Sequence, residues 1–190
     1  MNFVEKRIIS DGKIGEGDVL KVDSFLNHQV DVDFLNEIGK EFYKIYNNCG
    51  VNKIITIEAS GIGIACITAQ FFNVPVVFAK KAKTVNIYGD VYTAKAESYT
   101  HKGAYDIIMS KEFIHKGDRV LIIDDFLAKG NALKALIKLV RDAEAEIAGI
   151  GIVIEKAYQG GGEYVRGLGI RVESLARIAS MNVENGIIFC

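Results

Sequence analysis

The segment Val120–Ala132, which reads VLIIDDFLAKGNA, restricts the possible folds of this 190-residue chain more than any other segment. Its first four residues are apolar, and such a run is typical of a strand that is buried on both faces of a parallel sheet. Two acids follow, then a short turn with Gly130, and then a helix with apolar residues at steps of three and four. The order of strand, turn and helix predicts a βα unit of an α/β sheet.

The same alternation of strand and helix patterns continues along much of the chain. Apolar runs at 53–57, 74–79 and 147–154 predict further interior strands, and residues 62–72 predict a helix between the first two. An earlier helix carries Leu35, Ile38, Phe42 and Ile45 on one face, and we expect Asp33 to cap it. The fold class is therefore α/β, a mostly parallel sheet flanked by helices, in one domain over residues 1–190 with its core at about 50–156.

Residues 81–105 fit neither the helix period nor the strand period. They are polar, rich in Tyr and Lys, and poor in candidate core positions. Irregular stretches of this length inside a compact domain are more often functional than connecting, so we expect a lid or functional hairpin here.

The charge balance excludes partners that are gathered by a long-range field. Twenty-three basic and 24 acidic residues give a net charge of −1, so we expect no nucleic-acid surface and no anionic-membrane surface. The chain starts without a signal-peptide pattern and has no apolar run of about 18 residues, which predicts a cytoplasmic protein. The three cysteines share no short spacing and the three histidines are scattered, so neither a disulfide framework nor a structural zinc site is expected.

The acids Asp124 and Asp125 lie where open α/β sheets bind ligands, at the carboxyl edge of a strand. The turn after them presents backbone N–H groups at a helix N-terminus, which is a phosphate site by geometry and dipole. Because carboxylates repel phosphate, the two acids suit sugar hydroxyls or a hydrated Mg²⁺ carried by the substrate. The segment therefore predicts a phosphate on the loop and a ribose on the acids.

Three other interpretations of these motifs are weaker. A strand that ends in two aspartates also resembles the Walker B strand of nucleoside triphosphatases, but no Gly-Lys pair here precedes Ser or Thr. The pair Gly61 and Gly63 suggests a dinucleotide fingerprint, but its third position is Cys66. Capping of the helix alone needs one aspartate rather than two.

The segment VLIIDDFLAKGNA resembles the phosphoribosyl-pyrophosphate (PRPP) signature of the type I phosphoribosyltransferases. Segments Gly17–Asp31, Asp118–Asp125, Ala148–Lys156 and Gly169–Ile178 together are similar to the bacterial xanthine phosphoribosyltransferases, over nearly the whole chain. The chain departs from the general signature at Ala128 and Ala132, where many relatives carry hydroxyl residues, and at Lys129, where the residue is usually small. We therefore expect backbone N–H groups to carry most of the phosphate contacts.

The resemblance implies a role for each candidate site residue. Asp124 and Asp125 would hold the ribose hydroxyls and stabilise a cationic sugar. The 5′-phosphate would lie on Ala128, Lys129, Gly130, Asn131 and Ala132. Pyrophosphate would be bound by Glu58, Ala59, Ser60, Gly61 and Lys81. Lys80, Lys81 and Lys83 would begin a mobile hood over PRPP. Xanthine would be bound by Leu20 on the purine face, Asn27 at its edge and Lys156 at an exocyclic oxygen.

The resemblance also implies the architecture and the reaction. It implies a type I phosphoribosyltransferase fold with a small hood built from about 1–35 and 157–190, and a mobile loop at about 81–105. The expected reaction joins xanthine to PRPP and yields xanthosine 5′-monophosphate (XMP) and pyrophosphate. Mg²⁺ would be carried by PRPP, with no direct protein ligand, and the chain would form a homodimer. Two alternatives stay open: the same chemistry on hypoxanthine, guanine or adenine, and a PRPP-sensing transcriptional regulator.

Overall fold

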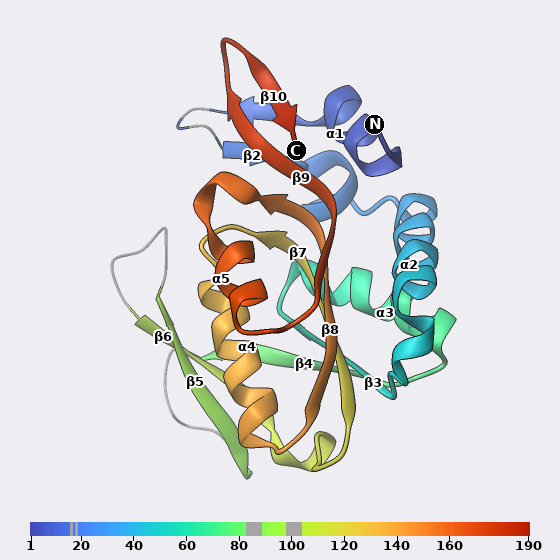
Figure 1. Ribbon diagram of the computed structural model, residues 1–190, viewed down its shortest axis with the longest axis vertical. Coiled ribbons are helices and arrows are strands. Elements are labelled where there is room, and N and C mark those ends of the chain that lie inside the picture. Colours follow the sequence, from blue (N-terminus) through green and yellow to red (C-terminus); the bar gives the residue numbers. More distant parts are fainter. Residues whose placement is uncertain (16, 18, 83–88, 98–103) are drawn as a thin grey trace.

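An eight-stranded sheet forms the centre of the computed structural model, which describes residues 1–15, 17, 19–82, 89–97 and 104–190 (Figure 1). The strand order is β10-β9-β8-β7-β3-β4-β6-β5. Five neighbouring strands are parallel: β9 (Val172–Asn182), β8 (Glu146–Lys156), β7 (Arg119–Leu127), β3 (Lys53–Ile57) and β4 (Val76–Ala82). The edges are antiparallel, with β10 (Gly186–Phe189) at one end and β6 (Ala104–Ser110) and β5 (Val91–Glu97) at the other.

Helices cover both faces of the sheet and divide the core in two. Helices α2 (Val32–Tyr46) and α3 (Ser60–Phe72) pack on one face, whereas α4 (Asn131–Asp142) and the short α5 (Gly161–Gly167) pack on the other (Figure 1). Strand β7 shows why its apolar run is continuous. Leu121 and Ile123 belong to the first core and Val120 and Ile122 to the second, and all four are fully buried.

The N-terminal segment lies beside the C-terminal strands at one end of the molecule (Figure 1). It contains α1 (Phe3–Asp11), the hairpin of β1 (Lys13–Gly15) and β2 (Val19–Lys21), and a π-helical turn over Asp23–Asn27. The Asn2 side-chain amide donates to the carbonyl oxygen of Leu175 in β9 at 2.5 Å. Arg7 of α1 pairs with Asp31 at 2.8 Å, so the segment is tied to both β9 and α2. Three short 3₁₀ turns complete the described elements: Asn47–Cys49, Lys111–Phe113 and Ala157–Gln159.

Two of the expected helix starts are wrong. The second helix is capped by Asp31, whose carboxylate accepts from the Phe34 N–H at 3.1 Å, and not by Asp33, which lies in its first turn. Helix α3 begins at Ser60 rather than at residue 62, so Ser60 and Gly61 belong to a helix N-terminus instead of a loop.

The stretch 81–105 is more regular than its sequence indicates. Residues 81 and 82 continue β4, residues 91–97 form β5, and β6 begins at residue 104. Cross-strand pairing with β6 holds both neighbours, and this tertiary pairing outweighs the weak local pattern. The remaining positions of the expected mobile loop, 83–88 and 98–103, lie outside the described residues, as does Lys83.

No helix in the described part of the chain is both long enough and apolar enough to cross a membrane.

Candidate active site

The predicted site residues of three parallel strands meet at one edge of the sheet. Strands β3, β7 and β8 run side by side in the same direction, so their carboxyl ends lie together. Strand β3 leads into Glu58–Gly61, β7 carries the two aspartates and leads into 128–132, and β8 ends at Lys156. The topology therefore brings the sugar, phosphate and base candidates of these strands to a common edge.

Asp124 is the buried acid of the pair. Asp124 is only 6% exposed, and one of its carboxylate oxygens accepts a hydrogen bond from the Asp125 N–H at 3.0 Å. Burial raises the pKa of the Asp124 carboxyl well above its ordinary value, and the neighbouring Asp125 charge raises it further, while Lys81 opposes the shift. The Asp124 carboxylate is thus held away from water, and in this environment its charge acts more strongly on nearby groups than it would in water.

The loop after β7 is shaped for an anion. Gly130 has a φ of +79° and directly precedes α4, and as a glycine it has no side chain with which to cap that helix. The first N–H groups of any α-helix have no carbonyl partner within the helix. A helix N-terminus of this kind, preceded by a small-residue loop, is suited to a phosphate group.

The turn after β3 is fastened to β4. The N–H of Glu58 donates to the Ala79 carbonyl at 3.1 Å, and the Glu58 carboxylate accepts from the Lys81 N–H at 2.5 Å. The peptide bond between Glu58 and Ala59 is cis. These contacts place Lys81 next to the turn, and its charge acts on Asp124 as well.

Gly61 lies so close to its neighbours that no larger residue fits. A Cβ atom there would lie 2.1 Å from the Thr56 hydroxyl oxygen and 3.2 Å from an Asp124 carboxylate oxygen. Thr56 is fully buried, and its hydroxyl finds no hydrogen-bond partner among the residues that the structure describes. The N-terminus of α3 and the buried acid of β7 are thereby packed against each other through a glycine.

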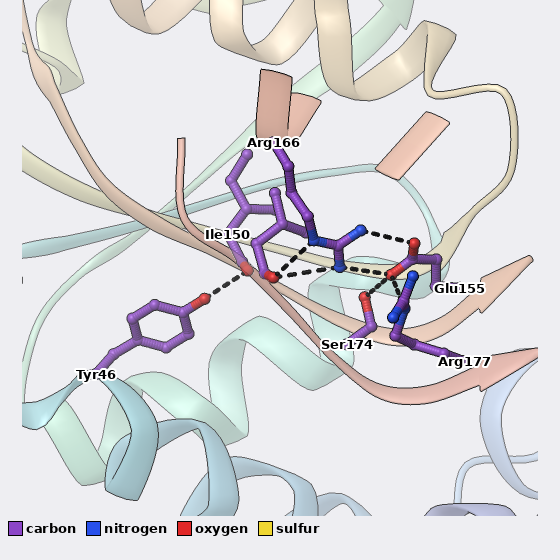
Figure 2. Close-up of polar contacts among 7 residues, drawn as sticks. Tyr46, Ile150, Glu155, Arg166, Ser174 and Arg177 are labelled. Atoms are coloured by element: carbon purple, nitrogen blue, oxygen red, sulfur yellow. Dashed lines mark hydrogen bonds and ion pairs between the residues drawn. The ribbon is translucent and has the colours of Figure 1, made fainter. Parts of the chain in front are cut away.

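Lys156 ends β8 directly after Glu155, a buried carboxylate at the centre of a charge cluster (Figure 2). Its neighbour Glu155 is only 1% exposed and accepts from Arg166 of α5 through both carboxylate oxygens at 2.8 Å. Figure 2 shows Ser174 and Arg177 of β9 pointing toward the same carboxylate. The carboxyl end of β8 is therefore bound both by α5, through Arg166, and by β9, through Ser174 and Arg177.

The two base candidates of the N-terminal segment have different surroundings. Leu20 is 5% exposed and shares a hydrophobic cluster with Ile154 and Ile178. Ile178 of β9 lies opposite Lys156 of β8 in the sheet. Asn27 ends the π-helical turn, and its side-chain oxygen is buried without a hydrogen-bond partner in the described part of the chain. Such an acceptor is available to a polar ligand.

The structure separates the lysines that the sequence groups together. Lys81 lies at the candidate site, whereas Lys80 points to the opposite side of β4, with its ammonium 5.8 Å from the centre of the Phe78 ring. Tyr105 of β6 is a site neighbour that the sequence did not indicate. Its pKa is raised by burial and by the Asp124 charge, which places it near the acid pair.

Comparison with known proteins agrees with this geometry. Residues 29–164 match the family profile of the phosphoribosyl transferase domain. Xanthine phosphoribosyltransferase of Lachnoclostridium phytofermentans is 59% identical over 188 residues, which are 99% of this chain and 97% of the relative. Xanthine phosphoribosyltransferase 1 of Clostridium perfringens (strain 13 / Type A) is 53% identical over 190 residues and 100% of both chains.

The chain belongs to the phosphoribosyl transferase family. The resemblance predicted from the motif is thus confirmed. The solved structure of APRTase from Giardia lamblia complexed with 9-deazaadenine superposes on this phosphoribosyl transferase with a TM-score of 0.79 at 24% identity, covering 93% of this chain and 98% of the other. Adenine phosphoribosyl transferase from Trypanosoma brucei superposes with a TM-score of 0.78 at 19% identity, covering 92% and 79%. The predicted type I phosphoribosyltransferase fold is confirmed.

Proposed function

We propose that this phosphoribosyl transferase joins xanthine to PRPP and forms XMP and pyrophosphate. The observation that carries the proposal is the arrangement at the end of β7, where the buried Asp124 and its half-buried neighbour Asp125 precede the Gly130 loop and the N-terminus of α4. Close relatives named xanthine phosphoribosyltransferase, similar over the whole chain, support the choice of base.

In this proposal PRPP binds across the three strand ends. The 5′-phosphate accepts from N–H groups of residues 128–132 at the start of α4, and Asp124 and Asp125 accept from the ribose hydroxyls. The pyrophosphate lies on Glu58–Gly61, at the N-terminus of α3, and beside Lys81. Its Mg²⁺ enters as part of the PRPP substrate. Among the described residues no cluster of three or more His, Cys, Asp or Glu side chains forms a metal site of the protein's own.

In this proposal one hydrogen-bond donor, one hydrogen-bond acceptor and one apolar side chain recognise the base. Lys156 donates to an exocyclic oxygen of the purine, and the buried side-chain oxygen of Asn27 is available as an acceptor for a purine N–H. Leu20 supplies an apolar contact to the purine face. A lysine donor favours oxopurines over adenine, because the 6-amino group of adenine is itself a donor and offers the lysine no acceptor.

The chemistry needs positioning and charge stabilisation rather than a protein nucleophile. Nitrogen of the purine attacks the ribose C1′ while the bond from C1′ to the pyrophosphate oxygen breaks, with inversion at C1′ and loss of one proton from the base. Positive charge develops on the ribose in the transition state. The two carboxylates beside the sugar stabilise that charge, and Lys81 and the backbone N–H groups stabilise the leaving pyrophosphate.

The proposal extends to the assembly and location of the protein. We propose a cytoplasmic homodimer in which residues 1–35 and 157–190 form the hood. Light scattering on the purified protein is expected to give twice the 20.9 kDa mass of one chain. A monomer at assay concentration would contradict the dimer without affecting the assignment of the base.

A base panel tests the proposed function. The purified protein is incubated with PRPP and Mg²⁺ and, in parallel, with xanthine, hypoxanthine, guanine or adenine, and nucleotide formation is measured by chromatography. The highest kcat/KM is expected with xanthine, with lower values for guanine and hypoxanthine and the lowest for adenine. If adenine is the best substrate, Lys156 does not have the proposed role. If no base reacts, a gel shift with purine-gene promoter DNA tests the regulator alternative.

A further inference from the structure

The charge cluster around Glu155 lies between α5 and the strands β8 and β9, outside the groups that contact substrate in the proposed function. The Glu155 carboxylate accepts two hydrogen bonds from Arg166 and one from the Ser174 hydroxyl at 2.5 Å. It also forms an ion pair with Arg177 at 3.3 Å. Arg166 also donates to the Val172 carbonyl from Nε at 3.3 Å and from Nη2 at 3.2 Å. Helix α5 is thereby locked to β8 and β9 (Figure 2).

Two consecutive glycines connect this ion pair to the phosphate loop. A Cβ atom on Gly162 would lie 2.1 Å from a Glu155 carboxylate oxygen and 2.5 Å from an Arg166 nitrogen, so the backbone lies directly on the ion pair. A Cβ atom on Gly161 would lie 2.2 Å from the Ala128 carbonyl oxygen and 2.8 Å from the Gly130 nitrogen. The Gly161 N–H also donates to the Ala128 carbonyl at 3.1 Å.

The contacts form one continuous path from a buried charge to an anion site. The ion pair fixes Gly162, Gly162 is bonded to Gly161, and Gly161 fixes both ends of the turn 128–130. Glycine at both positions allows the two backbones to approach closely. A shift of α5 must therefore move the loop whose N–H groups are assigned to the 5′-phosphate, since no flexible side chain separates them.

We propose that Glu155 and Arg166 are positioning residues for PRPP, because their ion pair holds the loop 128–132 in its binding conformation through Gly161 and Gly162. The inference rests on the proposed function in taking PRPP as the ligand of that loop. It assigns no contact with substrate to either residue. Small displacements of binding groups have large effects on affinity and rate, so loosening the pair is expected to weaken PRPP binding.

Two variants disturb the path at different points. Glu155→Gln keeps the shape of the side chain but replaces one acceptor oxygen with an N–H₂ group, so the bidentate contact with Arg166 is lost. Gly162→Ala leaves all charges in place and forces a methyl group against the Glu155 carboxylate. For both we expect the KM for PRPP and the Kd for Mg²⁺-PRPP by calorimetry to rise about tenfold, with a smaller change in kcat. Arg166→Lys, which keeps the positive charge, is expected to have a smaller effect than Arg166→Met.

Matched controls separate positioning from loss of stability. Gly167→Ala changes a glycine of the same helix where a Cβ atom meets nothing within 4 Å. Asp118→Asn breaks the ion pair between Asp118 and Lys53, whose side chains are both largely buried. This pair lies at the amino end of β7, away from the loop 128–132. Asp118→Asn is expected to lower Tm without changing the KM for PRPP, and Gly167→Ala is expected to change neither.

The outcomes are distinct. Values of KM and Kd for PRPP within twofold of wild type in Gly162→Ala and in Glu155→Gln, with only Tm lowered, would overturn the inference. If Glu155→Gln does not fold, the same criterion applies to Arg166→Met, and values of KM and Kd for PRPP within twofold of wild type in that variant would overturn the inference. If the wild type binds Mg²⁺-PRPP but converts no purine base, the proposed function fails, while the calorimetric comparison of the variants still decides this inference.

Discussion

At the scale of single residues, the candidate site is built from groups that are costly to bury. Asp124 is a carboxyl with 6% exposure beside a second carboxyl, and Thr56 is a buried hydroxyl without a partner in the described part of the structure. Neither arrangement stabilises the fold, since burial penalises an unpaired charge or polar group. Proteins commonly tolerate such costs where function requires them.

Replacing Asp124 with Asn is expected to stabilise the protein at neutral and alkaline pH. The pKa of Asp124 is raised in the folded state, mainly by burial, from an ordinary value of 3.8. The folded state therefore binds this proton more tightly than the unfolded chain, and the free energy of unfolding decreases as pH rises from about 4 through the folded pKa. The Asn variant lacks this decrease, so its Tm should exceed that of wild type by about 2–4 °C for each kcal/mol relieved.

Calorimetric scans of both proteins between about pH 4 and pH 8 measure this difference. The Tm advantage of Asp124→Asn is expected to grow with pH and to vanish near pH 4. A variant less stable than wild type at pH 8 would show that the charged carboxylate is stabilised in the fold.

Substitution of Gly61 is expected to depend on Thr56. In Gly61→Ala the new methyl group overlaps the Thr56 hydroxyl at 2.1 Å, and overpacking of this kind costs about 1–3 kcal/mol. Thr56→Ala removes the hydroxyl, so the double variant should recover most of the lost stability and activity. Gly63→Ala is the matched control, because its Cβ atom meets only Leu35 at an ordinary 3.6 Å. Equal losses in the single and double variants, measured by thermal unfolding, would contradict this account.

At the scale of elements, the sequence predicts the interior strands best. The run at 53–57 coincides with β3, and the runs at 120–124 and 147–154 lie inside β7 and β8, because burial on both faces leaves a continuous apolar signal. Helix starts and the outer strands were predicted less well. Strand β5 pairs with β6 over its whole length, a non-local contact that leaves little trace in its own polar sequence.

The ion pair between β3 and β7 offers a test at this scale. Lys53 and Asp118 join the amino ends of the two strands at 2.5 Å, with side-chain exposures of 11% and 16%. Burial by itself raises the pKa of Asp118, but the hydrogen bonds from Lys53 and from the His115 N–H outweigh it and lower the pKa below 3.8. This carboxylate therefore contributes stability above its unfolded pKa that is lost as pH falls through its folded pKa.

Asp118→Asn is accordingly expected to reduce the free energy of unfolding by about 1–3 kcal/mol near neutral pH. The loss should shrink as the pH falls below about 4, because wild type then loses the same charge. Urea titrations at several pH values measure it. A loss that does not depend on pH would indicate that packing rather than charge holds this pair.

At the scale of the whole molecule, the candidate site joins segments that are far apart in the chain. The parallel order of β3, β7 and β8 could be expected from the sequence, and with it the meeting of Glu58–Gly61, the Asp pair and Lys156. The surroundings of Leu20 and Asn27 could not, because the π-helical turn and the docking of residues 1–31 on β9 depend on long-range contacts such as that of Asn2 with Leu175. The contributions of Tyr105 and of the Gly161–Gly162 turn likewise arise only in three dimensions.

The net charge of −1 fits this arrangement, because the proposed site meets a polyanion with local groups rather than with a global field. One helix N-terminus at Gly130, the turn before α3 and Lys81 supply the positive potential.

The most direct test of the central claim is the rate of XMP formation by the double variant Asp124→Asn, Asp125→Asn, measured beside wild type with saturating PRPP, Mg²⁺ and xanthine. The account predicts a fall in kcat of about 10³-fold, since the stabilisation of the sugar cation is removed, together with a Tm at neutral pH equal to or above that of wild type. Turnover close to the wild-type rate in a folded double variant would contradict the assignment of this strand end as the catalytic site.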